Sequence, residues 1–381
     1  FILNNLGYFE MGGVNVMAYQ DIYPEGHQGG IAVIMHGKRL ATNGDLRLDE
    51  TPGQWQPIPK QLDRKVDAAG KTITVKLAYP DPAINRKGFN PIEYPDLNLK
   101  YTVKIRSEGA SVIVTVDLET PVPEEFIGKV GFNMELFPGI LFGKTWIMDK
   151  SSGIFPRQAN GPALTDTKGE IVAAVPMSTG KKLTVAPESD LLRMSIESRT
   201  GDLQLLDGRY VHNNGWFVVR SLVAAGATEN AVEWIISPNM VSGWRSDPVI
   251  HVSQIGYHTD QDKVAIIEVD KNDKTPRNAE LIRIGENGSR TVMTGINPEL
   301  WGSFLRYRYF MFDFSSFRQE GMYCVKYGDE LSQPFRISPD VFKRDVWQPT
   351  LEYFLPVQMC HMRVNEKYRV WHGLCHMDDA L

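Results

Sequence analysis

The sequence predicts a mainly β chain, built from two successive antiparallel sandwiches and followed by a helical region. Short runs of alternating polar and apolar residues recur along most of the chain, and each run ends at Gly, Pro, Asn or Asp. Such alternation is typical of antiparallel sheets with one solvent-facing side, because parallel strands read as continuous apolar runs. Apolar residues at helical spacing first recur after residue 340.

Composition limits the classes of function. The 381 residues suggest two or three domains, at about 100 to 200 residues per domain. Hydrophobic residues make up 42% of the chain and charged residues 23%, which is ordinary for a globular protein. The net charge of −5, with no basic segment, argues against nucleic acid as a partner. No apolar run approaches the roughly 20 residues of a membrane span, and no secretory signal opens the chain, so we expect any targeting segment to have been removed.

Residues 1–245 are predicted to form one large antiparallel sandwich. The hairpin signal is clearest in "YTVKIRSEGASVIVTVDLE", where the "SEGAS" turn joins two alternating runs. The predicted strands lie in the runs "IAVIMHG", "KTITVKLAYP", "LKYTVKIRSEGASVIVTVDLET", "EIVAAVPM", "LLRMSIES", "GWFVVRSLVAAG" and "NAVEWIIS".

A second sandwich is predicted over residues 246–340. Pro238, Gly243 and Pro248 interrupt the strand pattern and place a domain boundary near residue 246. The strand runs that follow are spaced as in an immunoglobulin-like β-sandwich. These runs are "VIHVSQIGY", "KVAIIEVD", "AELIRIGENGSRTVMTG", "YRYFMFDFSSF" and "GMYCVKYGDELSQPFRIS".

Residues 341–381 are predicted to begin a helical domain. Ser338 or Asp340 is the expected helix cap. The apolar residues that fall near a 3.6-residue spacing are Val346, Trp347, Leu351, Phe354 and Leu355.

Cys and His residues cluster near the end of the chain. Thiolate and imidazole are the ligands that tetrahedral zinc prefers, so the cluster is a candidate metal site. Its members are Cys360, His361, His372, Cys375 and His376. Two other interpretations stay open: reduced, half-buried cysteines beside helix-end histidines, or a disulfide between Cys360 and Cys375. Cys324 stands alone in a strand-like run and is expected to be buried.

Carboxylates and loops give weaker signals. Asp378 and Asp379 form a pair that glycoside hydrolysis or cation binding would need, but adjacent residues point apart on a helix, which favours a solvated or capping role. Calcium is a second metal that stays open, at "ANGPALTDTKGE" and "LLDGRYVHNNGW". Neither segment has the alternating carboxylates of a calcium loop, so turns explain both better.

Tryptophans of the first domain are candidates for stacking on sugar rings. Large aromatic side chains dominate core burial, so most of them are expected inside the sandwich. The five residues are Trp55, Trp146, Trp216, Trp234 and Trp244.

Several motifs of the second half resemble a known family. "VSQIGYHTDQDKVAIIEV", "DFSSFRQEGMYCVKY" and "SQPFRIS" resemble the immunoglobulin-like module that precedes the catalytic domain of glycoside hydrolase family 9 cellulases. "LEYFLPVQMCHMRV" and "HGLCHMDDA" resemble the opening of that family's (α/α)₆ barrel. The resemblance covers roughly residues 249–381 and does not cover residues 1–245.

The resemblance implies a structural zinc rather than a catalytic centre. Cys360, Cys375 and His376 match the family's zinc positions, and the fourth ligand would come from downstream or from His361 or His372. The family hydrolyses β-1,4-glucan with inversion of the anomeric configuration, using the aspartates of a Gly-Gly-Trp-x-Asp-Ala-Gly-Asp motif as base and a distant glutamate as acid. This sequence contains no such motif. We therefore predict no catalytic residue in this chain.

The sequence as a whole predicts the non-catalytic front of a secreted, periplasmic or cell-surface endo-1,4-β-glucanase. The implied partners are β-glucan and the remainder of the catalytic domain, so we expect the chain to be a fragment of a longer protein. Two alternatives stay open: an N-terminal sandwich that binds glucan through exposed aromatic residues, and a structural spacer that only docks the barrel.

Overall fold

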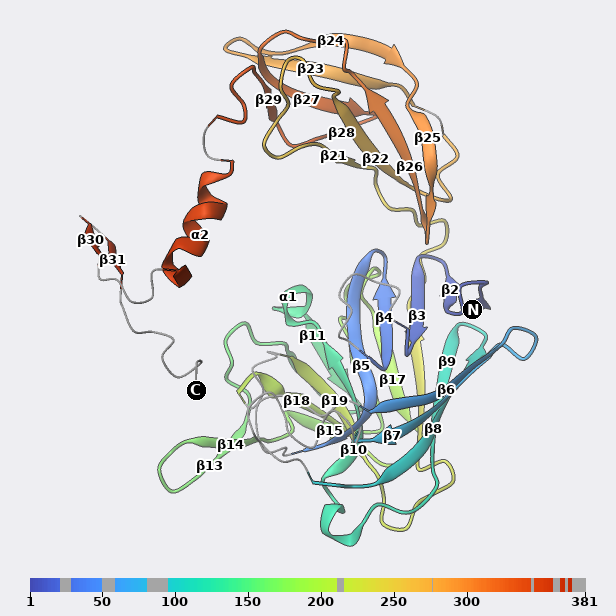
Figure 1. The fold of residues 1–381 in the computed structure, drawn as a ribbon. Coiled ribbons are helices and arrows are strands. Elements are labelled where there is room, and N and C mark those ends of the chain that lie inside the picture. The colour runs from blue at the N-terminus through green and yellow to red at the C-terminus, as the bar shows by residue number, and fades with distance from the viewer. Residues whose placement is uncertain are drawn as a thin grey trace. The chain divides into compact units, whose positions relative to one another are not determined.

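The structure is a computed structural model of the 381-residue chain. It divides into two compact units, Phe1–Trp244 and Arg245–Leu381, which we describe separately (Figure 1). The residues that the structure describes are 1–20, 29–49, 59–80, 95–210, 216–275, 277–343, 346–358, 364–366 and 369–371.

The first unit contains two nine-stranded sheets, and every strand pair within them is antiparallel. In spatial order, the first sheet consists of β1 (Ile2–Leu3), β2 (Phe9–Met11), β3 (Val14–Ala18), β4 (Ile31–Met35), β5 (Lys38–Leu48), β10 (Val130–Leu136), β19 (Phe217–Leu222), β18 (Leu203–Asp207) and β15 (Ser178–Gly180). The second consists of β12 (Ser151–Ile154), β11 (Thr145–Met148), β16 (Lys182–Val185), β17 (Met194–Ser198), β20 (Val232–Pro238), β9 (Ser111–Leu118), β8 (Leu99–Glu108), β7 (Thr72–Tyr79) and β6 (Lys60–Asp67).

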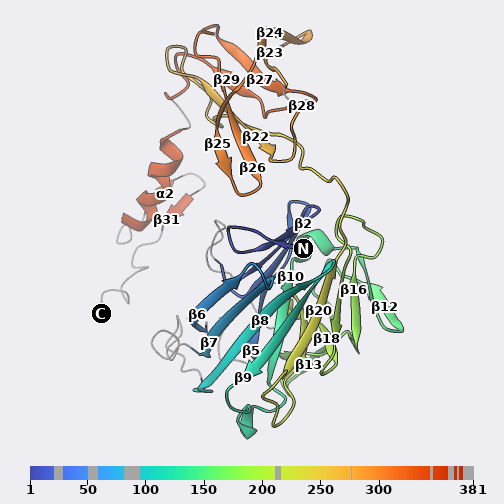
Figure 2. The same ribbon diagram turned by 90° about the vertical axis from the view of Figure 1, so that its right-hand side faces the viewer.

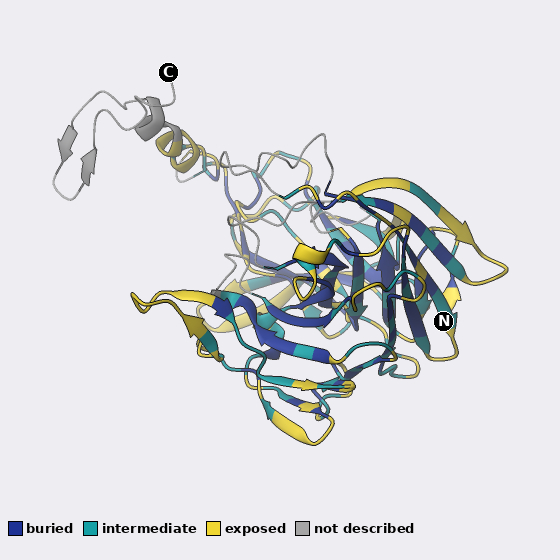
Figure 3. Ribbon diagram, turned by 90° about the horizontal axis from the view of Figure 1, so that it is seen from below, coloured by how far each residue is buried: buried dark blue, intermediate teal, exposed yellow. Residues whose placement is uncertain are grey.

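The two sheets share one hydrophobic core. Along β7, β8 and β9, every second residue is buried, because successive side chains of a strand point to opposite faces of the sheet. Figure 3 colours the strands by burial. The ring of Trp234 on β20 meets that of Phe132 on β10 at 5.0 Å between centroids. Trp234 Nε1 also donates to Ser221 Oγ on β19 at 2.8 Å, so the indole is satisfied although it is fully buried.

Smaller elements complete the first unit. They are the hairpin of β13 (Ala163–Thr165) and β14 (Ile171–Ala174), helix α1 (Pro138–Leu141), and the 3₁₀ turns η1 (Glu124–Phe126) and η2 (Gly208–Tyr210). All seven runs predicted as strands in residues 1–245 contain observed strands, including the β8–β9 hairpin closed at Glu108 and Ser111.

The second unit contains a four-stranded and a five-stranded antiparallel sheet (Figure 2). The first sheet has the order β21 (Val249–His251), β22 (Val264–Asp270), β26 (Tyr307–Asp313) and β25 (Glu299–Phe304). The second contains β24 (Gly288–Ile296), β23 (Ala279–Gly285), β27 (Gly321–Tyr327) and β28 (Glu330–Leu331), and β29 (Phe335–Ile337) also pairs with β27.

Aromatic rings fill the core between these two sheets. Tyr257 contacts Phe314 and Phe335, with 5.2 Å between ring centroids in both pairs. Cys324 on β27 is a buried free thiol, as the sequence predicted. Burial raises its pKa, which keeps the thiol protonated and unreactive.

The last described elements are α2 (Gln348–Gln358) and the hairpin of β30 (Val364–Glu366) and β31 (Arg369–Trp371). The predicted cap at Ser338 or Asp340 is wrong, because α2 begins only at Gln348. Ser338 Oγ instead donates to the Asp340 carboxylate, and Lys343 N–H donates to the carbonyl oxygen of Asp340, within a turn. One such helix does not establish the predicted barrel.

Candidate functional site

The predicted zinc ligands Cys360, Cys375 and His376 lie outside the described residues, as do His361 and His372. The zinc site therefore stays a prediction. The described part of the chain contains no group of three or more His, Cys, Asp or Glu residues that could hold a metal ion.

Asp378 and Asp379 also lie beyond the described ranges, so their role stays a prediction. None of the helices in those ranges has the length and apolar character that a membrane crossing requires.

The two segments considered for calcium form turns where they are described. Asp166 Oδ1 accepts the backbone N–H groups of Lys168 and Glu170 at 2.8 and 2.9 Å, which shapes the β13–β14 turn. Asp207 is held by Arg209, with Oδ1 and Oδ2 each accepting at 2.7 Å. These carboxylates already have protein partners, which supports their interpretation as turn and ion-pair residues.

The first-domain tryptophans do not form an exposed platform in the described residues. Trp146 and Trp234 are buried. Trp216 packs edge-on against Phe137 at 4.4 Å between ring centroids, and Trp244 packs against His36 at 5.2 Å. Trp55 lies outside the described residues. Every described aromatic side chain in residues 1–244 whose exposure is known is buried or half-buried.

A cluster of buried titratable side chains surrounds Asp45 on β5, just beyond the point where β5 stops pairing with β4. β4 pairs with β5 only as far as Gly44. Beyond that point, Asp45 Oδ1 accepts the hydroxyls of Tyr19 and Tyr101 at 2.8 and 2.7 Å. Asp45 Oδ1 also accepts the N–H of Leu46, at 2.8 Å.

The pKa shifts and the burial of this cluster indicate a structural role. Burial raises the pKa of Asp45, and Arg47 and the hydrogen bonds oppose that rise. Burial and the neighbouring Asp45 raise the pKa of Tyr19 and Tyr101, so both hydroxyls stay protonated and act as donors. Asp45 is only 2% exposed, so a substrate has no access to its carboxylate.

A group of aromatic side chains on β25 and β26 forms an exposed surface of the second unit. Trp301 is 69% exposed and Phe304 is 54% exposed, while Tyr307 and Tyr309 are half-buried. The rings of Trp301 and Tyr309 meet edge-on at 6.4 Å between centroids. We call Trp301, Phe304, Tyr307 and Tyr309 the aromatic strip.

Strand register places the aromatic strip on the outward face of the four-stranded sheet. Phe304 lies opposite Tyr307, and the register of β25 shifts between Leu300 and Gly302. Trp301 occupies this irregularity, and such a bulge re-aims a side chain. Phe310 and Phe312, at the alternate positions of β26, belong to or pack on the core.

Sequence reasoning missed β25 and therefore Trp301. Gly302 interrupts the alternation in "ELWGSF", so the run lacks a clean strand signal. The available signal was a Trp followed by Gly just before the predicted strand "YRYFMFDFSSF".

The charged side chains of this outward face are acidic or paired. Glu268 lies opposite Tyr309, Glu299 lies opposite Met311, and Asp313 ends β26. His251 Nε2 lies 3.9 Å from Glu268 Oε2. No Lys or Arg occupies the outward positions of these four strands, all of which the structure describes.

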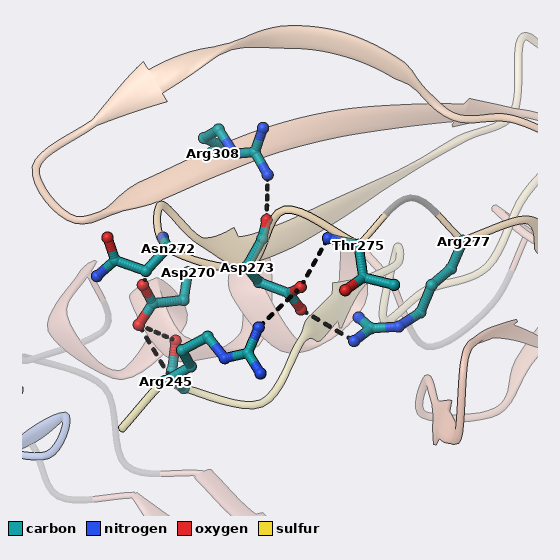
Figure 4. A network of polar contacts seen from close by, with 8 residues as sticks. Arg245, Asp270, Asn272, Asp273, Thr275, Arg277 and Arg308 are labelled. Carbon is teal, nitrogen blue, oxygen red and sulfur yellow. Dashed lines mark hydrogen bonds and ion pairs between the residues drawn. The ribbon is translucent and has the colours of Figure 1, made fainter. Parts of the chain in front are cut away.

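A polar network near the chain entry of this unit fixes the loop after β22 (Figure 4). Asp270 is fully buried and accepts the Arg306 guanidinium at 2.6 Å and the Ser246 N–H at 3.0 Å. Asp273 forms ion pairs with Arg277 at 3.0 Å and Arg245 at 3.5 Å.

The network holds both carboxylates charged. Burial alone would raise the pKa of Asp270, but hydrogen bonds from the Asn272 N–H and from Arg306 outweigh burial and lower it. The pKa of Asp273 is also lowered, because the Thr275 N–H and Arg277 outweigh its burial. Arg308 donates to the carbonyl oxygen of Asp273. The network therefore ties β26, which carries half of the aromatic strip, to the loop after β22.

Comparison with known families decides the character of the second sandwich. Residues 245–332 match the family described as "Cellulase N-terminal ig-like domain". This chain therefore carries an immunoglobulin-like domain of the cellulase type, and the resemblance seen in the sequence of this domain is confirmed. We refer to it below as the Ig-like domain. No curated protein matches the chain.

Solved structures give weaker likenesses. A metagenome-derived glycoside hydrolase family 9 endoglucanase is 21% identical at a TM-score of 0.25, covering 34% of this chain and 24% of its own. A family 9 glycoside hydrolase of Bacteroides ovatus is 21% identical at a TM-score of 0.25, covering 32% and 20%. A heparan sulfate lyase mutant of Pedobacter heparinus is 10% identical at a TM-score of 0.29, covering 74% and 39%. Likenesses at these TM-scores establish neither fold nor function. The chain spans about a quarter or less of the length of the family 9 structures that it matches.

Proposed function

We propose that this chain is the non-catalytic N-terminal part of a secreted family 9-like endo-1,4-β-glucanase that takes part in polysaccharide degradation. The observation that carries the proposal is the match of residues 245–332 to the cellulase N-terminal Ig-like domain. The absence of the family's Gly-Gly-Trp-x-Asp-Ala-Gly-Asp motif from the sequence supports a non-catalytic role for this part.

Inversion requires one carboxyl group to protonate the leaving oxygen and another to activate water on the opposite side. The buried carboxylate of Asp45 does not meet this requirement, because Tyr19 and Tyr101 occupy it and solvent does not reach it. In this proposal the Ig-like domain contributes positioning or binding, and the hydrolysis is performed elsewhere in the protein.

Of the two alternatives, the spacer role remains compatible with the Ig-like domain. An N-terminal sandwich that binds glucan through exposed rings gains no support from residues 1–244 as far as they are described, since their aromatic side chains are buried or half-buried. The exposed strand aromatics lie in the Ig-like domain instead.

Two assays test the proposal. The 381-residue chain is expected to release no reducing ends from soluble cellulose derivatives or mixed-linkage β-glucan. The native polypeptide that contains this sequence, captured from its source with an antibody against residues 1–244, is expected to hydrolyse β-1,4-glucan with inversion, followed by NMR of the anomeric product. Native protein that is inactive on every β-glucan, or turnover by the chain itself that is lost in Asp378→Asn, would overturn the proposal.

A further inference from the structure

The aromatic strip of the Ig-like domain has the properties of a binding surface. A truncated Trp301 or Phe304 would remove little core contact, because both side chains are more than half exposed. Exposed apolar groups that gather on one face mark sites of interaction, whereas single exposed apolar residues do not. The strand register brings Phe304, Tyr307 and Tyr309 onto one face, and the ring contact between Trp301 and Tyr309 places Trp301 beside them.

We infer that the aromatic strip binds a neutral β-1,4-linked glucan chain, an inference that rests on the proposed function. Equatorial substituents leave the two faces of a β-glucopyranose ring lined with C–H groups. These faces are apolar and slightly positive, so they complement the negative face of an aromatic ring. The strip offers an indole that is 69% exposed at Trp301 and further rings along β26 at a spacing of about 7 Å, which is two strand residues.

Polar groups beside the rings suit a polyhydroxylated ligand. Glu268 on β22 is directly opposite Tyr309, and Glu299 on β25 is directly opposite Met311. Ionised carboxylates accept hydrogen bonds, and sugar hydroxyls donate them. The surface therefore combines stacking rings with acceptors within one patch.

Charge excludes anionic glycans from this site. The outward positions of β21, β22, β26 and β25 carry Glu268, Glu299 and Asp313, and the buried Asp270, which Arg306 of the β25–β26 turn neutralises. No Lys or Arg occupies any of these described positions. A sulfated or uronic polysaccharide would bring like charges against these carboxylates, which is unfavourable. A neutral glucan meets no such repulsion.

The same charges disfavour a second copy of the chain as the occupant. A two-fold dimer places the same patch of each copy face to face. Glu268 and Glu299 of one copy would then lie near the same residues of the other, with no Lys or Arg at the outward strand positions to neutralise them. A glucan chain is therefore the occupant that the charges favour.

The binding test uses the whole chain and four variants. Affinity electrophoresis in soluble β-1,4-glucan gels and pull-down on amorphous cellulose measure retention of wild type, Trp301→Ala, Trp301→Phe and Tyr309→Ala. Trp347→Ala is the matched control, because Trp347 is 56% exposed but lies outside the sheet. Stacking on one aromatic ring contributes about 1–3 kcal/mol in nucleic-acid complexes, so we expect Trp301→Ala to weaken glucan binding about fivefold or more. Trp301→Phe should lose less, and Trp347→Ala should bind as wild type.

Charge and ligand class give a second readout. Binding to neutral glucan should change less than about twofold between low and high salt, because no ion pair forms. Heparan sulfate and polygalacturonate should not be retained. Salt-sensitive retention of these anions in preference to glucan would contradict the inference.

The outcomes separate this inference from the proposed function. Failure of the wild-type chain to bind glucan, or equal binding by Trp301→Ala, refutes the glucan site even if the native protein hydrolyses glucan. Concentration-dependent dimerisation that Trp301→Ala abolishes would assign the strip to a second copy and would likewise refute the inference. A native protein that does not hydrolyse glucan would instead refute the proposed function.

Discussion

The Asp270→Asn substitution tests whether the network in Figure 4 stabilises the Ig-like domain. Asp270 is fully buried, and its carboxylate accepts Arg306 at 2.6 Å, the Ser246 N–H at 3.0 Å and the Asn272 N–H at 2.9 Å. An asparagine keeps the shape and one acceptor oxygen but leaves the buried guanidinium of Arg306 without its counter-charge. Removal of one partner of a buried pair costs about 3–5 kcal/mol.

Hydrogen–deuterium exchange of the whole chain in a urea series resolves this domain, through peptides from β22 and β26. With a urea dependence of about 1–3 kcal/mol/M, the unfolding midpoint should fall by at least about 1 M. Asp313→Asn is the matched control, since Asp313 is exposed and its carboxylate accepts the Ser315 N–H at 2.8 Å. We expect that control to cost less than about 1 kcal/mol. An unchanged midpoint in Asp270→Asn would refute the stabilising role.

The pH dependence of stability tests the contribution of the Asp270–Arg306 pair independently. The folded-state pKa of Asp270 is lowered below its ordinary value of 3.8. Its stabilising contribution is therefore complete above that value and is lost as the pH falls through the lower, folded-state pKa. The stability difference between wild type and Asp270→Asn should shrink below roughly pH 4. A difference that grows on acidification would contradict this assignment.

Three further predictions concern the cores. Tyr101→Phe removes one of the two tyrosine donors to Asp45 and should cost the first unit about 1–3 kcal/mol in urea unfolding, whereas an unaltered midpoint would mean that the hydroxyl is dispensable. Gly256→Ala should destabilise the Ig-like domain in thermal unfolding, because φ is +100° and a Cβ would overlap the carbonyl oxygen of Arg336; a wild-type melting temperature would show that this loop adapts. Cys324 should stay unlabelled by a thiol reagent in the native chain and react after unfolding, as followed by peptide mass spectrometry, since burial raises its pKa; rapid native labelling would contradict its burial.

The fold class could be predicted because alternation and turn residues both report on sheet structure. The run containing "SEGAS" folds as the β8–β9 hairpin, and the run "KVAIIEVD" folds as β22 with Ala265, Ile267 and Val269 in the core. Long β5 was harder to predict, because its residues from Leu40 onward are almost all buried and alternation disappears there. Sheet order was not predictable, since partners such as β10 and β19 are far apart in sequence.

The candidate site could be predicted only in part. Its Tyr307 and Tyr309 lie in a predicted strand, but Trp301 lies in an irregular strand whose pairing shifts by one residue. A bulge depends on the partner strand as well as on local sequence, so no periodicity within "ELWGSF" reveals it. The buried pair of Asp270 and Arg306 likewise forms across 36 sequence positions, beyond the reach of local patterns.

The irregular pairing of β25 also affects how this chain behaves at high concentration. β25 is the last strand of its sheet, and a regular last strand would offer its unpaired backbone groups to strands of other molecules. The register shift between Leu300 and Gly302 breaks the spacing of those groups at the middle of the strand. The register shift therefore disfavours strand-to-strand aggregation along this sheet edge, so the chain can expose a tryptophan there and still stay dispersed at high concentration.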